Sequence, residues 1–150
     1  MPKIIGFNHF SATVADMGRA LGFWRDLLGL ELLGQGVVEY EHLDQIVGLD
    51  GTRIEWAELA LPGGGLIELF CYLSPVGRPL AGSVNDPGKT HLCLEVEELD
   101  GLLAGLHAAG IHSASPEPVE IPSGNWLGFR CAYVFAPDEV VVELAERPAG

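Results

Sequence analysis

The chain repeats one strand pattern after 82 residues, and this internal repeat limits its possible folds more than any other sequence feature. The segment GFNHFSATV, at residues 6–14, alternates apolar and polar side chains, and GKTHLCLEV, at residues 88–96, does the same. In both segments a histidine, His9 or His91, lies on the face opposite the apolar side chains. A repeat of this length indicates two equivalent halves, so each residue is best interpreted together with its counterpart.

A helix is predicted after each of these strands, because apolar residues recur there at helical spacing. The first helix covers residues 16–29, with Asp16 as its N-cap and Gly29 just past its end. The second covers residues 97–110, with a weaker N-cap and with Gly110 at its end. Short alternating strands follow in each half, at residues 37–43, 52–61 and 66–73 in the first and, after one further strand, at residues 128–136 and 140–146 in the second.

Each half therefore has the order β-α-β-β-β, and the predicted fold is α+β, with two βαβββ modules that form a cupped mixed sheet around a shared cavity. Module 1 spans about residues 4–73 and module 2 about residues 90–147, and the Pro-, Gly- and Ser-rich stretch 74–89 is the connector. Together they are expected to form a single domain, residues 1–150. The irregular stretch 113–125 is interpreted as a lid over the cavity or as a plain surface loop.

The chain is strongly acidic, with 8 basic and 21 acidic residues and a formal net charge of −13. This charge argues against nucleic acid and against an anionic membrane surface as partners, because both attract basic proteins. It favours a neutral or weakly acidic small molecule over a highly anionic one such as a coenzyme A ester. No apolar run approaches the roughly 18 residues of a membrane span, and MPKIIGFNHF does not resemble a signal peptide, so a cytoplasmic location is expected. The three cysteines, Cys71, Cys93 and Cys131, lie in predicted strands without CxxC spacing and are interpreted as reduced, buried residues.

Two glutamates complete a four-residue pattern with the histidines. Glu68 and Glu143 interrupt the apolar strands LIELF and VVVEL, and they follow the histidine of their half by 59 and 52 residues. Burying two carboxylates together is costly, whereas a divalent cation bound by His9, Glu68, His91 and Glu143 removes this cost. These ligands suit zinc, nickel, cobalt, manganese or ferrous iron, and an exposed edge-strand residue is the alternative for Glu68 alone. Phe70 shares the face of Glu68 and is a candidate wall of the cavity.

This pattern resembles the vicinal oxygen chelate superfamily, which includes glyoxalase I, methylmalonyl-CoA epimerase, extradiol dioxygenases, and the fosfomycin and bleomycin resistance proteins. The resemblance covers nearly the whole chain and is most specific in NHFSATVADMGRALGFWRDLLGLEL, GLIELFCYLSP, GKTHLCLEVEELD and VVVELAE. It implies that His9, Glu68, His91 and Glu143 hold a divalent metal ion with two open positions for adjacent oxygens of a small organic substrate. The chain departs from the family at residues 136–139, which are Ala-Pro-Asp-Glu in place of Asp-Pro-Asp-Gly.

The resemblance implies a metal-dependent lyase or isomerase that abstracts a proton next to a carbonyl group. Glu143 or Glu68 would then act as base as well as ligand, and Asp44 in EHLDQIVG roughly matches a further acidic residue of the epimerases, unless it is an exposed turn residue. The alternative is a ferrous extradiol ring-cleavage dioxygenase, which needs only His9, His91 and Glu143 and would take up oxygen with a catechol. A non-catalytic drug-binding resistance protein ranks last, because such proteins generally lack these ligands. A homodimer is expected, with the metal site within one chain or shared between two.

Overall fold

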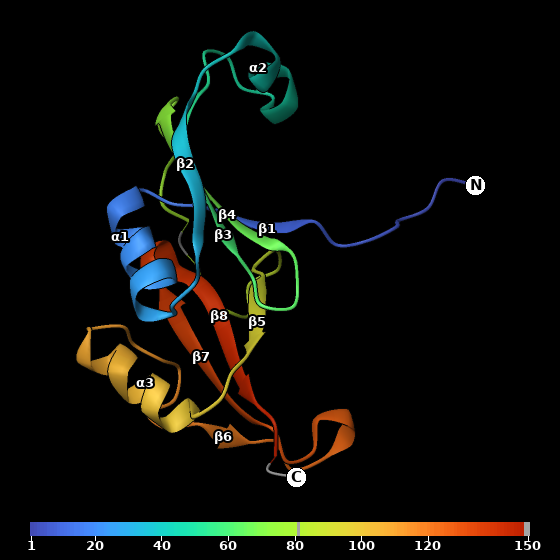
Figure 1. Ribbon diagram of the computed structural model, residues 1–150, viewed down its shortest axis with the longest axis vertical. Helices are drawn as coiled ribbons and strands as arrows, with labels where there is room; N and C mark the ends of the chain where they lie inside the picture. The colour runs from blue at the N-terminus through green and yellow to red at the C-terminus, as the bar shows by residue number, and fades with distance from the viewer. Residues whose placement is uncertain (81, 149–150) are drawn as a thin grey trace. The chain divides into compact units, whose positions relative to one another are not determined.

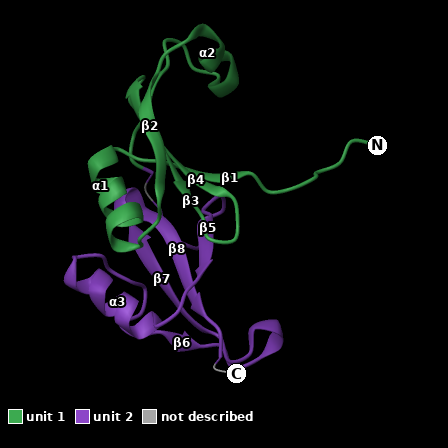
Figure 2. Cartoon of the chain, viewed as in Figure 1, with its two compact units in different colours: residues 1–79 green, residues 80–150 purple. Residues whose placement is uncertain are grey.

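The chain divides into two compact units, Met1–Pro79 and Leu80–Gly150 (Figure 2). The division falls within the predicted connector, residues 74–89. Each unit contains a four-stranded sheet of its own.

The computed structural model describes residues 1–80 and 82–148. Residue 81 of the predicted connector and residues 149–150 of the predicted domain lie outside the described residues. In the part of the chain that is described, no helix is long and apolar enough to cross a lipid bilayer.

The first unit is built around a four-stranded sheet (Figure 1). Its elements are β1 (His9–Thr13), α1 (Met17–Leu21), the π-helical turn η1 (Gly22–Leu27), β2 (Leu32–Val38), α2 (Glu41–Val47), β3 (Arg53–Ala60) and β4 (Leu66–Ser74). The strand order is β1-β4-β3-β2, with β1 parallel to β4 and the other neighbours antiparallel. α1 packs against β3 and β4, and the side chains between helix and sheet include Leu59, Ile67 and Leu69, all fully buried.

The second unit repeats this topology. Its elements are β5 (His91–Glu95), α3 (Leu99–Ala108), β6 (Val119–Glu120), η2 (Gly124–Trp126), β7 (Arg130–Ala136), η3 (Pro137–Glu139) and β8 (Val140–Glu146). The strand order is β5-β8-β7-β6, with β5 parallel to β8 and the other neighbours antiparallel. The predicted α+β fold of two modules with the order β-α-β-β-β is confirmed, with α2 as an additional helix in the first.

The first helix begins and ends as the sequence predicts, but its second half is wider than an α-helix. Asp16 is the N-cap, and its Oδ1 accepts a hydrogen bond from the backbone N–H of Arg19 at 2.8 Å. Gly29 follows the helix at φ 73°, a conformation that favours glycine. The π-helical turn buries Phe23 beside Trp24 in a T-shaped contact. Regular helical spacing does not predict Phe23 in the core, because it assumes an unbroken turn of about 3.6 residues.

The prediction of a strand at residues 37–43 is correct only at residues 37 and 38. β2 begins earlier and ends within this stretch, and the rest of the stretch starts helix α2, which buries Leu43 and ends at Gly48 with φ 72°. The sequence conceals the true extent of β2 because Gly34 and Gly36 lie in its middle, and glycine is depleted in strands.

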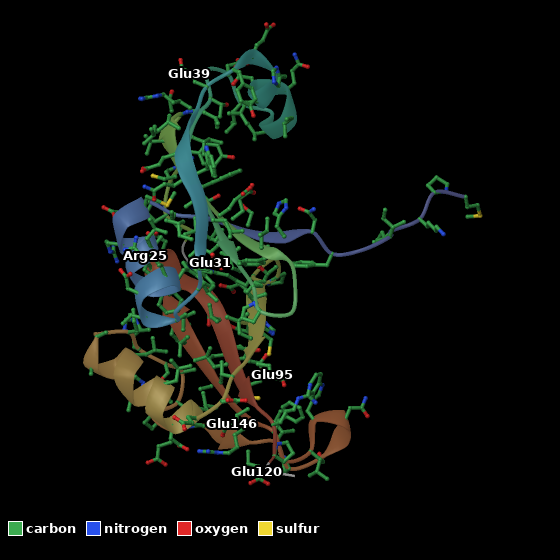
Figure 3. The ribbon with its side chains drawn as sticks, viewed as in Figure 1. Arg25, Glu31, Glu39, Glu95, Glu120 and Glu146 are labelled. Carbon is green, nitrogen blue, oxygen red and sulfur yellow. The ribbon has the colours of Figure 1, made fainter. Side chains whose placement is uncertain are left out.

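Helix α3 is capped by a side chain from another element. Its N-cap residue, Glu98, makes no side-chain capping bond, in agreement with the weak cap expected from the sequence. Instead Oε1 of Glu146, at the end of β8, accepts a hydrogen bond from the backbone N–H of Leu99 at 3.0 Å (Figure 3). Arg130 on β7 donates to Glu146 at 3.2 Å and to Asp100 of the helix at 2.6 Å. The start of the helix is therefore tied to the sheet through Glu146.

The irregular stretch 113–125 is partly sheet, which corrects the prediction of a plain surface loop, whereas a lid over the cavity stays a prediction. Ser113 forms a bridge with Val134, and β6 within the stretch pairs with β7. The further strand that the sequence predicts before residue 128 corresponds to β6, but its two residues are too few for a periodic signal to give its bounds.

The turn before β8 contains two residues in the left-handed region. Asp138 has φ 63° and Glu139 has φ 59°. This region favours glycine, and aspartate tolerates it better than glutamate does. The turn in which this chain lacks the family's glycine therefore keeps a backbone that suits glycine.

The prediction that all three cysteines are buried is correct only for Cys71. Cys131 is half-buried and Cys93 is exposed. Cys93 lies on β5, an edge strand with a single neighbour, which explains its exposure. Within the described residues, none of the three forms a disulfide.

Candidate metal centre

The first unit brings His9 and Glu68 together on neighbouring strands. β1 and β4 pair in the register that sets Ser11 opposite Glu68, and His9 is two residues before Ser11, on the same face. The Nε2 atom of His9 lies 3.4 Å from Oε2 of Glu68. The side chains are 41% and 19% exposed, so both remain reachable by a ligand.

The second unit contains the equivalent pair, His91 and Glu143. β5 and β8 pair in the register that sets Cys93 opposite Glu143, and His91 is two residues before Cys93, on the same face. The Nε2 atom of His91 lies 3.2 Å from Oε2 of Glu143, with side chains 43% and 19% exposed. The two units therefore present a histidine and a glutamate in the same register and with similar exposure.

Asn8 orients His9 and is not among the site residues that the sequence predicts. Its Oδ1 lies 2.7 Å from Nδ1 of His9. A hydrogen bond from a protonated Nδ1 to this amide oxygen leaves the lone pair of Nε2 directed toward Glu68. Histidine ligands of metals are commonly held in this way by an acceptor on the second ring nitrogen. The adjacency of asparagine and histidine in NHF is the only sequence signal for this contact.

Tyr133 lies beside the second pair and is another site residue that the sequence does not predict. It faces Glu143 across the β7–β8 ladder, and its hydroxyl is 3.4 Å from both ring nitrogens of His91. The two rings are tilted by 42°, with their centroids 5.0 Å apart. Desolvation and the negative charge of Glu143 raise the pKa of Tyr133, so its hydroxyl keeps its proton and can donate a hydrogen bond.

The thiols of Cys93 and Cys131 both interact with Glu143. Desolvation, followed by the charge of Glu143, raises the pKa of Cys93 to about 12. Desolvation and a hydrogen bond with Glu143 raise the pKa of Cys131 to about 11. Both thiols are therefore protonated at neutral pH.

Asp44 lies in helix α2 and orders the loop that follows. Its carboxylate accepts hydrogen bonds from the backbone N–H groups of Gly51 at 2.9 Å and Thr52 at 2.7 Å. These bonds, with Thr52 contributing most, lower the pKa of Asp44. The resemblance implies that Asp44 matches a further acidic site residue of the epimerases, with an exposed turn residue as the alternative. The structure places Asp44 in a helix, with both carboxylate oxygens accepting backbone hydrogen bonds, and its catalytic role stays a prediction.

The donors in each unit fit half of a divalent-metal site. Among residues 1–80 and 82–148, no three His, Cys, Asp or Glu side chains gather closely enough to hold a metal ion. Each unit thus offers a pair, one imidazole and one carboxylate, with Nε2 and Oε2 on facing sides. These donor types suit zinc and the other first-row divalent metals.

Comparison with known proteins agrees with this fold. The family model described as Glyoxalase/Bleomycin resistance protein/Dioxygenase superfamily matches residues 6–147. A protein named 2-epi-5-epi-valiolone epimerase, from Actinomyces sp, is 28% identical over 153 residues, which cover 100% of this chain and 84% of the relative.

Solved structures with the same fold include a glyoxalase family protein from Bacillus cereus, with a TM-score of 0.84 and 25% identity over 99% of this chain and 97% of that one. They also include glyoxalase I from Leishmania major, with a TM-score of 0.64 and 18% identity over 95% of this chain and 87% of that one.

Proposed function

The chain belongs to the Glyoxalase/Bleomycin resistance protein/Dioxygenase superfamily, and on this premise we propose that it is a metal-dependent isomerase of the epimerase type. The observation that carries the proposal is the matched pair of histidine and glutamate in the two units. The relative named as an epimerase, similar over the full length of this chain, supports the same class of reaction.

We propose that His9, Glu68, His91 and Glu143 hold one divalent ion, within one chain or between two copies. A bound ion of this kind supplies Lewis acidity to a carbonyl oxygen and stabilises negative charge that develops there. The substrate is a small organic molecule with two adjacent oxygens. Asn8 fixes the orientation of His9, and Tyr133 lies against the ring of His91.

The proposed chemical step is a proton transfer at the carbon beside the substrate carbonyl. A carboxylate oxygen of Glu143, or of its counterpart Glu68, accepts the proton, and the electron pair of the broken C–H bond moves onto the carbonyl oxygen. A proton from the other glutamate or from water then adds to the opposite face of the carbon, the electron pair returns from the oxygen to the new C–H bond, and the epimer results. Asp44 is the least supported base, because both oxygens of its carboxylate accept backbone hydrogen bonds.

Proton exchange in heavy water tests this proposal. We expect the metal-loaded protein to incorporate deuterium beside the ketone of 2-epi-5-epi-valiolone, as followed by NMR, and we expect the metal-free protein not to do so. Glu143→Gln and Glu68→Gln should each slow the exchange by about 100-fold or more, which is the usual contribution of a general base. Exchange that is absent with zinc, nickel, cobalt, manganese and ferrous iron alike would refute the proposal. Oxygen uptake with a catechol by the iron-loaded protein would favour the dioxygenase instead.

A further inference from the structure

We propose that Trp56 forms a stacking surface for a neutral, polyhydroxylated ring in the substrate, an inference that rests on the proposed function and names its substrate class. Trp56 lies on β3, beside the two glycines of β2. Three observations support the proposal: the packing of the indole, its position relative to Glu68, and the kind of polar group around it.

The indole of Trp56 lies over Gly34 and Gly36. A Cβ atom on Gly34 would come within 3.3 Å of the six-membered end of the indole, and one on Gly36 within 3.3 Å of its Nε1. Neither glycine has a positive φ, so backbone conformation does not require them. Their lack of side chains instead makes room for the ring, whose long axis therefore follows β2. The indole therefore covers the two glycines, and because Trp56 is half-buried, part of its surface remains reachable from solvent.

The indole shares a sheet face with the candidate metal ligands of its unit. Trp56 pairs with Phe70 of β4, and the next pair on the same face is Glu58 with Glu68. His9 is on this face as well, next to Glu68. All but His9 are half-buried, so the face is lined with aromatic and carboxylate groups that solvent still reaches.

The indole and the carboxylates on this face favour a ligand that contains a saturated ring with hydroxyl groups. A flat, half-buried indole packs against the C–H bonds on one side of a saturated ring, and this contact also removes apolar area from water. Carboxylates such as Glu58 accept hydrogen bonds only, so they suit a ligand that presents hydroxyl donors. A phosphate or carboxylate on the ring would be repelled by the neighbouring acidic groups and by the net charge of −13.

An aromatic side chain over a strand glycine also stabilises a sheet without binding any ligand. A purely structural role for Trp56 predicts that its removal lowers stability and affects all ligands alike. The proposed role predicts a loss that depends on the ring of the ligand. The experiment therefore compares two ketones that share the adjacent carbonyl and hydroxyl oxygens, cyclic 2-keto-myo-inositol and open-chain erythrulose.

Dissociation constants of both ketones, measured by calorimetry on the metal-loaded protein, test the inference. We expect Trp56→Ala to weaken binding of the cyclic ketone by about tenfold, the effect of one lost aromatic contact, and to change erythrulose binding less than about twofold. Trp56→Phe should retain part of the affinity, and Gly36→Val, which displaces the indole, should resemble Trp56→Ala. Trp126→Ala, which removes an exposed tryptophan in the second unit, is the control and should leave both constants unchanged.

Three results would overturn the inference: no binding of the cyclic ketone, equal losses for both ketones in Trp56→Ala, or tighter binding of the cation cyclohexylamine than of the cyclic ketone. Failure of the proposed function would look different. In that case deuterium exchange is absent, while binding of the cyclic ketone still depends on Trp56.

Discussion

The Nε2 atom of His91 lies 3.2 Å from Oε2 of Glu143, and the histidine stands two residues before the position that pairs with the glutamate. The first unit keeps the same offset between His9 and Glu68. In both units the histidine lies on an edge strand and the glutamate on the interior strand beside it, with the same register and the same contact. The matched geometry is therefore the main structural support for a shared function of the two pairs.

Asn8→Ala should weaken metal binding. The substitution removes the acceptor that holds Nδ1 of His9, and loss of such a partner usually lowers metal affinity by about 10- to 100-fold. Competition with a chelator of known zinc affinity measures the change. Asn8→Asp, which keeps an acceptor at this position, should bind zinc nearly as well as the wild type. Asn125→Ala, at an exposed position of the second unit, is the control. Unchanged affinity in Asn8→Ala would show that His9 needs no such support.

Glu139→Gly should stabilise the protein by about 0.5–1 kcal/mol, because glycine relieves the left-handed strain at φ 59°. The greater conformational entropy of glycine in the unfolded chain cancels part of this gain. Chemical denaturation measures the free energy of unfolding. Gly48→Ala introduces the opposite change at φ 72° and should destabilise the protein by a similar amount. A loss of stability in Glu139→Gly would mean that the glutamate side chain makes a stabilising contact.

Glu146→Ala should destabilise the protein by about 0.5–2 kcal/mol, the usual range for the loss of a helix cap. The substitution removes the acceptor for the backbone N–H of Leu99 and one partner of Arg130. Thermal unfolding measures the effect. Glu146→Gln keeps an acceptor oxygen and should lose less. Glu120→Ala, at an exposed glutamate on β6, should change little. Equal effects of Glu146→Ala and Glu120→Ala would argue against the cap.

The contribution of Asp44 to stability should vanish in acid. Its pKa lies below the ordinary value of 3.8, because the folded loop donates hydrogen bonds to the carboxylate. The stabilisation is therefore complete above pH 3.8 and is lost as the pH falls through the lower pKa of the folded state. Melting temperatures of wild type and Asp44→Asn should differ at neutral pH and converge in acid. Glu41→Gln, in the same helix, is the control. A difference that grows in acid would contradict this role.

The sequence predicts the repeated part of the fold well. Two copies of one pattern, each with a strong alternating strand and an amphipathic helix that ends at a glycine, identify the modules and the strands that carry His9, Glu68, His91 and Glu143. The predictions fail where a local rule is broken. Gly34 and Gly36 interrupt the periodicity of β2, and the π-helical turn shifts Phe23 into the core.

The supporting residues of the site are harder to predict because they depend on contacts between elements. Tyr133 reaches His91 only through the register of three strands, and Glu146 caps a helix that starts 47 residues before it. Asp44 illustrates the reverse case. A resemblance suggests a catalytic acid, whereas its hydrogen bonds with Gly51 and Thr52 indicate a structural role.

Cobalt titration of the metal-free protein, followed by its visible absorption spectrum, tests the central claim most directly. If His9, Glu68, His91 and Glu143 ligate the same ion, the wild type binds one cobalt ion per chain, and His9→Ala and His91→Ala each abolish or greatly weaken that single binding event. Two independent ions per chain, or a variant of either histidine that binds cobalt as tightly as the wild type, would contradict the account.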